Sequence, residues 1–142
     1  MGLVYLHKKN NSMKILKCIG VLLFIGLCLS CEDDNNNDLI QAQEAENLNL
    51  MLEEIELIAA SHNCDDPSEW RYTSYGTKAC GGYVGYFAFH KTIDMDLFFG
   101  KIEAHRLAED LYNIKWGIIS DCAVTPKPNG VICENGSPIL VY

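Results

Sequence analysis

The placement of cysteines constrains this chain more than any other feature of its sequence. Seven cysteines fall into two groups, three between residues 18 and 31 and four between residues 64 and 133. Around the first group of cysteines, Lys14 and Lys17 precede an apolar run from Cys18 to Leu29. About 12 apolar residues are too few to span a bilayer of roughly 30 Å as a helix, but they suit the centre of a secretory signal peptide. The sequence therefore predicts export, and with it an oxidising environment for the second group.

The apolar run ends in the sequence Cys28-Leu29-Ser30-Cys31. This ending resembles the lipobox of bacterial lipoproteins, in which a small residue stands directly before the modified cysteine; Cys28 departs from the usual Leu. The resemblance implies that residues 1–30 are a lipoprotein signal peptide and that Cys31 carries the lipid. We expect Met13 to be the functional start, which makes residues 1–12 either a misassigned upstream start or a longer basic region. The alternative is an uncleaved anchor or a buried helix.

Residues 31–38 are acidic and rich in asparagine. A segment of this composition has little to bury, so we expect a solvated tether. It also resembles the acidic export signal that follows the lipidated cysteine in surface lipoproteins of the Bacteroidota. That resemblance implies a lipid anchor in the bacterial outer membrane and display on the cell surface; the alternative is a plain spacer on a lipoprotein that faces the periplasm.

Charge is distributed unevenly along the chain. The net charge is −8, yet residues 1–30 contain four lysines and no acid, so residues 31–142 contain seven basic and nineteen acidic side chains. Such a body repels phosphate backbones, which excludes nucleic acid as a favoured partner. It favours a basic partner through electrostatic steering.

The second group of cysteines comprises Cys64, Cys80, Cys122 and Cys133. An even number in a small exported domain predicts two disulfides, for which three pairings are possible. We expect the two short loops, Cys64–Cys80 and Cys122–Cys133. A zinc site is disfavoured because these four cysteines include no Cys-x-x-Cys pair, and we expect no metal and no cofactor.

Local patterns predict one α+β domain over residues 39–142, with two helices and an antiparallel sheet. Residues 38–62 have a helical apolar stripe and Asp38 as a possible cap. Residues 94–114 form a second helix, capped by Asp94 and apolar on two faces, so we expect it to be packed between other elements. Strands are expected over residues 70–75 and 83–90, residues 118–124 form a strand or an irregular turn, and Asn135-Gly136 predicts a C-terminal hairpin.

Candidate binding residues surround the glycine-rich loop over residues 76–82. Paired glycines beside a disulfide, flanked by aromatic side chains, are typical either of a sharp turn or of a rigid binding loop. The candidates are Trp70, Tyr75, Lys78, Gly81, Gly82, Tyr83 and Tyr86. The alternative role for the aromatic residues is core packing.

Catalytic candidates are sparse. His62, His90 and His105 are scattered in the sequence, and the pairing of His105 with Glu109 is that of an ordinary helix surface. The chain has no phosphate-binding loop, no nucleophile elbow and no zinc-protease motif. We therefore expect no enzyme and no catalytic residue, with a small hydrolase centred on His90 or Asp121 as the weakest alternative.

The cysteines, glycines and aromatic residues of residues 62–142 together resemble a group of small Bacteroidota surface lipoproteins. The resemblance rests on Cys64, Trp70, the run from Gly76 to Gly82, Tyr86, Tyr112-Asn113, Gly117 to Cys122, Pro128, Gly130-Val131, Cys133 and Gly136. It implies one disulfide-rich domain on an exported lipoprotein and supplies no catalytic residue. The leading hypothesis is a non-enzymatic binding or inhibitor-like module for an extracellular protein or glycan; the alternative is an accessory subunit of an outer-membrane assembly or transporter.

Overall fold

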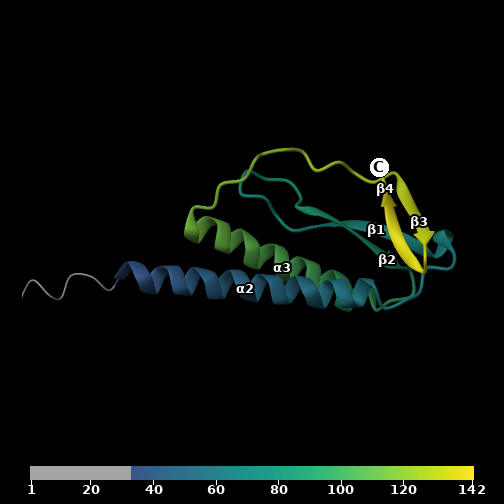
Figure 1. Ribbon diagram of the computed structural model, residues 1–142, viewed down its shortest axis with the longest axis horizontal. Coiled ribbons are helices and arrows are strands. Elements are labelled where there is room, and N and C mark those ends of the chain that lie inside the picture. The colour runs from purple at the N-terminus through teal and green to yellow at the C-terminus, as the bar shows by residue number, and fades with distance from the viewer. Residues whose placement is uncertain (1–32) are drawn as a thin grey trace, which may run out of the picture. The chain divides into compact units, whose positions relative to one another are not determined.

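The longest element is the helix α2, Asp33–Ala59, in a computed structural model that describes residues 33–142 (Figure 1). The signal peptide, Met13 and Cys31 lie outside these residues. The helix begins five residues before Asp38, so the prediction that Asp38 caps it is wrong. No Gly or Pro stands between Asp33 and Asp38 to stop the helix, and acidic residues favour a helix N-terminus at several positions, not only at the cap. The described residues from Gln41 onward form one compact unit.

A β-hairpin follows α2. A short 3-10 turn, η1 (Pro67–Glu69), leads into β1 (Trp70–Tyr75), which pairs antiparallel with β2 (Gly85–His90). Trp70 lies opposite His90, and Tyr75 lies opposite Gly85. The first strand has the predicted bounds, whereas the second begins two residues later than predicted. Tyr83 and Val84 instead belong to the loop, which Gly81 and Gly82 turn with φ near +90°.

The second helix, α3 (Met95–Trp116), starts where its capping residue predicts. The Asp94 carboxylate accepts a hydrogen bond from the Leu97 amide at 3.0 Å. Gly117 ends the helix in the left-handed region, with φ +60°. Only one of the two apolar faces of α3 is buried, through Phe98 and Ile102. As predicted, α3 is packed between other elements, since it contacts both α2 and the β1–β2 hairpin. Its second apolar face, however, stays largely exposed in the described part of the chain.

The core lies where α2, α3 and β2 meet. Its buried members are Ile55, Ala59, Phe89, Ile93, Phe98 and Ile102. The rings of Phe89 and Phe98 lie 5.1 Å apart, which joins the hairpin to α3. Ion pairs of Lys101 with Glu54 and of Lys115 with Glu44 then hold α3 beside α2, with the two helices running in opposite directions.

The C-terminal hairpin consists of β3 (Gly130–Glu134) and β4 (Ser137–Val141). Its turn is Asn135-Gly136, with φ +51° and +78°, as the sequence predicted. The four strands form two separate two-stranded antiparallel sheets. This arrangement confirms the α+β class with two helices, antiparallel pairing and a C-terminal hairpin.

Both disulfides form, but the predicted pairing is wrong. Cys64 pairs with Cys133, and Cys80 pairs with Cys122. Backbone contacts explain the first pair, because the Cys64 amide donates to the Gly136 carbonyl at 2.8 Å and so brings the end of α2 to the C-terminal hairpin. The second pair joins the β1–β2 loop to the segment after α3. Neither helix of the described residues combines the length and apolar character needed to cross a membrane.

Candidate binding surface

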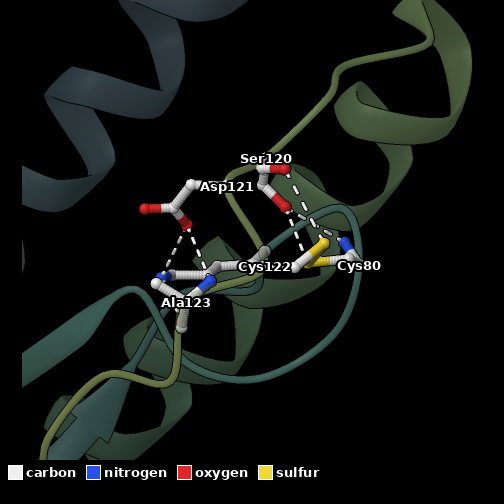
Figure 2. Close-up of a disulfide and its surroundings, with 6 residues drawn as sticks. Cys80, Ser120, Asp121, Cys122 and Ala123 are labelled. Atoms are coloured by element: carbon white, nitrogen blue, oxygen red, sulfur yellow. Dashed lines mark hydrogen bonds and ion pairs between the residues drawn. A yellow bond between two sulfur atoms is a disulfide. The ribbon is translucent and has the colours of Figure 1, made fainter.

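Two loops that lie far apart in the sequence are joined side by side; we call residues 76–84 and 118–127 the paired loops. The Cys80–Cys122 disulfide is the covalent link between them. Around it, the Cys80 amide donates to Ser120 Oγ at 3.2 Å (Figure 2). Lys78 Nζ donates to the Ala123 carbonyl at 2.7 Å, and Thr125 Oγ1 donates to the Tyr83 carbonyl at 2.6 Å. The second loop has no regular secondary structure, so these cross-links hold it in place.

The base of the paired loops is fixed to α3. The Thr77 amide donates to Glu109 Oε2 at 2.6 Å, and Asn113 Nδ2 donates to the Thr77 carbonyl at 3.0 Å. Gly76, which directly precedes Thr77, has φ +73°, and an added Cβ would lie 2.7 Å from Val84 Cγ2. Only glycine fits such a position without strain. The loop therefore leaves β1 in a defined direction.

Electrostatic contacts also hold the second loop. The Asp121 carboxylate accepts the Ala123 amide at 3.1 Å and pairs with Lys78 Nζ at 3.3 Å (Figure 2). These hydrogen bonds, the backbone one first, lower the pKa of Asp121. Lys78 was predicted as a binding residue. The Lys78 ammonium already pairs with Asp121 and donates to the Ala123 carbonyl, so these contacts hold the two loops together.

Apolar side chains nevertheless face solvent on the paired loops. Tyr83 is half exposed, and both Ile119 and Val124 are 93% exposed. Tyr83 also makes an edge contact with Tyr86, which in turn contacts Tyr72, with ring centroids 6.4 and 6.1 Å apart. An exposed apolar and aromatic surface on cross-linked loops is suited to contacting a macromolecule at low entropic cost.

The predicted binding residues divide into two sets. Gly81, Gly82 and Tyr83 are exposed on the first loop, and Tyr86 adjoins them. Trp70 is buried, and Tyr75 stacks on Phe87 at 4.1 Å beside the core. Burial, and secondarily the carboxylate of Glu56, raises the pKa of Tyr75. Trp70 and Tyr75 therefore support the fold beneath the surface.

Ile119 and Val124 were missed as candidate binding residues, because the sequence placed them in a strand or an irregular turn. The available signal was a set of apolar residues in a segment that leads into Pro126 and Pro128. Prolines in such a segment argue against a paired central strand. Because Ile119 and Val124 are not in a strand, they do not alternate toward the core, and both side chains remain exposed.

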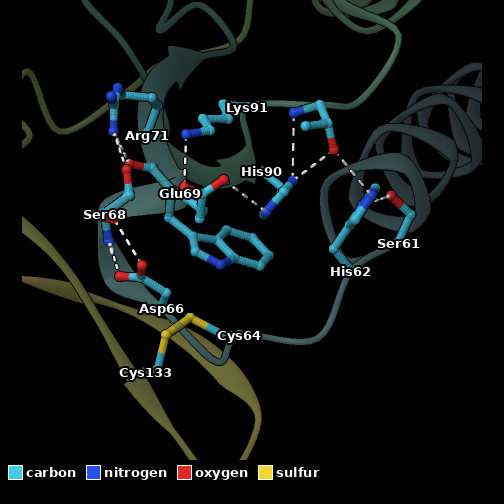
Figure 3. A network of polar contacts seen from close by, with 12 residues as sticks. Ser61, His62, Cys64, Asp66, Ser68, Glu69, Arg71, His90, Lys91 and Cys133 are labelled. Atoms are coloured by element: carbon cyan, nitrogen blue, oxygen red, sulfur yellow. Dashed lines mark hydrogen bonds and ion pairs between the residues drawn. A yellow bond between two sulfur atoms is a disulfide. The ribbon is translucent and has the colours of Figure 1, made fainter.

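The histidines are less scattered than their sequence positions predicted. His62 and His90 stack with ring centroids 4.4 Å apart and planes at 7° (Figure 3). Thr92 Oγ1 lies 2.8 Å from His90 Nδ1 and 3.3 Å from His62 Nε2, so one hydroxyl bridges the two rings. Glu69 Oε2 lies 3.9 Å from His90 Nε2 and also pairs with Lys91. This cluster joins the end of α2 to the end of β2.

The described residues contain no group of three or more His, Cys, Asp or Glu side chains placed to hold a metal ion. A hollow of about 300 Å³ between α2 and α3 and one of about 470 Å³ between the end of α2, β2 and β4 are lined by other residues. Neither includes His90 or Asp121.

His105 is buried, which corrects the prediction of an ordinary surface pairing. Its Nδ1 lies 3.9 Å from Glu109 Oε2, beyond hydrogen-bond distance, and that oxygen already accepts the Thr77 amide. The pair therefore belongs to the support beneath the paired loops.

In comparisons with known proteins, no family model, curated protein or solved structure matches the chain.

Proposed function

We propose that the protein is a lipid-anchored bacterial surface protein that binds an extracellular protein or glycan through the paired loops. The observation that carries the proposal is the exposure of Tyr83, Ile119 and Val124 on loops that a disulfide and several hydrogen bonds hold together. Exposed apolar side chains normally cost solubility. A binding partner that covers these side chains would account for their exposure on cross-linked loops.

Charge supports a particular kind of partner. The chain has a net charge of −8, and the excess of acid lies after residue 30. A basic extracellular protein, such as a cationic hydrolase, would be steered to this body, and its association rate would fall as salt rises. An inhibitor-like role follows if the paired loops enter the active site of that hydrolase.

Affinity capture on the purified full-length lipoprotein tests the binding surface. The immobilised protein is exposed to spent medium and envelope extract, and the captured macromolecule is identified by mass spectrometry. Val124→Asp places a charge at an exposed apolar position of the second loop, so we expect capture to fall by at least about ten-fold, as for an interface hot spot. Leu57→Asp is the matched control, because Leu57 is also well exposed but lies on α2.

Each outcome decides a part of the proposal. Equal capture by wild type and both variants contradicts the assignment of the paired loops. A soluble enzyme lost only in Val124→Asp supports the inhibitor-like role, whereas an outer-membrane protein lost in the same way supports an accessory subunit. In a parallel arm, Cys31→Ala should move the protein from the membrane to the soluble fraction and abolish palmitate incorporation. Retention in the membrane contradicts the lipid anchor.

A further inference from the structure

The outer face of α3 carries an unbroken apolar stripe. Leu97, Leu107, Leu111 and Ile114 on this face are between 49 and 73% exposed, and Gly100 and Ala104 between them are exposed as well. The six positions alternate in steps of three and four residues, which is the heptad spacing of a coiled-coil seam. Over residues 97–114 the stripe is about 26 Å long at 1.5 Å per residue.

Within residues 33–142, no member of this stripe belongs to the buried core. The opposite face of α3 supplies Phe98, Ile102 and His105 to the interior. At Gly100, an added Cβ would meet no atom within 4 Å, so packing within the chain does not require glycine there. Glycine is unfavourable in a helix interior. Its presence between Leu97 and Ala104 leaves room for a second helix to approach closely.

Charges along the two edges of the stripe have opposite signs. One edge carries the acids Asp96, Glu103 and Asp110, each directly before a stripe residue. The other edge carries Lys101 and Lys115, each directly after a stripe residue. In heptad terms, the acids occupy the g positions and the lysines occupy the e positions.

We propose that the protein forms a homodimer through α3, in which the two stripes pack against each other in parallel. In a parallel pair, each g residue faces the e residue five positions later in the partner. Asp96 then faces Lys101 of the second copy, and Asp110 faces its Lys115. Glu103 faces Ala108 and already has an ion pair within its own chain, with Arg106.

An antiparallel pair would place like charges together. In that orientation g positions face g positions, so Asp96 meets Asp110 and Glu103 meets Glu103, while the lysines meet on the other edge. The edge charges therefore select the parallel orientation. Lys101 and Lys115 also pair with Glu54 and Glu44 of α2 in the same chain, so in the dimer each lysine lies between two carboxylates.

The neighbouring helix enlarges the contact. A groove of about 300 Å³ separates α2 from α3 and adjoins the stripe at Leu111. It is lined by Glu44, Asn47, Leu48, Met51, Ala108, Leu111, Tyr112 and Lys115. Side chains of the second copy can enter this groove, so the dimer resembles a cluster of four helices rather than an isolated pair.

Sedimentation equilibrium of the full-length lipoprotein in density-matched detergent tests the dimer. Leu111→Glu should raise the dissociation constant by on the order of 100-fold, because each dimer loses two buried leucines and gains two unpaired charges. Leu57→Glu, on exposed α2 surface, is the control and should sediment as wild type. Circular dichroism checks that both variants keep their helices. A monomeric wild type at roughly 100 μM protein, or a Leu111→Glu variant that dimerises as wild type, overturns the proposal.

Asp110→Lys tests the orientation. In the parallel dimer it places two lysine pairs in contact at residues 110 and 115, so we expect dimerisation to weaken by roughly five-fold or more at low salt and the difference to shrink as salt rises. In an antiparallel dimer the same change would pair Lys with Asp96 and strengthen dimerisation. Stronger or unchanged association contradicts the parallel arrangement. This test reads out association of the chain with itself, so it stays separate from the capture of a foreign partner by the paired loops.

Discussion

The body of the protein and its paired loops keep their shape by different means. In the body, α2, α3 and β2 bury Ile55, Phe89 and Phe98 in a common core. In the paired loops, no residue from Ala79 to Val84 or from Ile118 to Lys127 is buried. A disulfide and hydrogen bonds across the loops take the place of a core there.

The two means of stabilisation leave different side chains accessible to solvent. Burial is the main source of stability, but a side chain that is buried in its own fold cannot contact a partner. A covalent cross-link restricts a loop without covering it. A domain of this size can therefore keep apolar side chains exposed and ordered by placing them beside a cross-link and supporting them from a packed body.

The largest predicted effect is a difference in the free energy of unfolding between a substitution in the body and one in the paired loops. Phe98→Ala should lower the free energy of unfolding by about 3–5 kcal/mol, since it removes a fully buried ring and leaves a cavity. Val124→Ala should change it by less than about 0.5 kcal/mol, because Val124 makes almost no buried contact. Urea unfolding measures both. A cost for Val124→Ala comparable to that for Phe98→Ala would show that the paired loops contain a core after all.

An intermediate effect is expected from removing the loop cross-link. Cys80→Ala combined with Cys122→Ala should cost roughly 2–4 kcal/mol, somewhat less than the chain-entropy estimate because the hydrogen bonds across the loops remain. Hydrogen exchange should accelerate at the amides of residues 79–84 and 118–127 and stay slow in β1 and α3. Uniform acceleration across the whole domain would contradict the separation of loops from body.

The smallest predicted effect comes from pH. The pKa of Asp121 is lowered below its ordinary value of 3.8 by the Ala123 amide and Lys78. The folded state therefore favours the carboxylate: its contribution is complete above about pH 3.8 and is lost as the pH falls through the lowered pKa. We expect the Ala123 amide to exchange faster in that acidic range. Asp121→Asn should remove this pH dependence, and its persistence in that variant would assign the effect to another group.

The sequence predicted the local elements of the fold well. The bounds of β1, the Asp94 cap and the Asn135-Gly136 turn each depend on a few adjacent residues, so local patterns suffice. The disulfide pairing depends on distant contacts. Loop-closure entropy grows only slowly with loop length, so loop length alone gave little reason to expect the pairing with the two short loops. In the folded chain the Cys64 amide donates to the Gly136 carbonyl, so this long-range contact brings Cys64 near Cys133.

The same distinction holds for the candidate site. Tyr83 and its glycines were found because a turn pattern marks them. The other half of the surface, Ile119 and Val124, became visible only when Cys80–Cys122 placed their segment beside the first loop. The stacking of His62 on His90 likewise requires the end of α2 and the end of β2 to meet.

The order of the two disulfides has one further consequence. The Cys80–Cys122 link lies entirely within the stretch closed by Cys64–Cys133, so the two links are nested. A single peptide-bond cleavage between residues 80 and 122 leaves two fragments that both links still join. A molecule that is cut once in its exposed loops therefore remains one covalent unit, with its C-terminal hairpin still attached to α2.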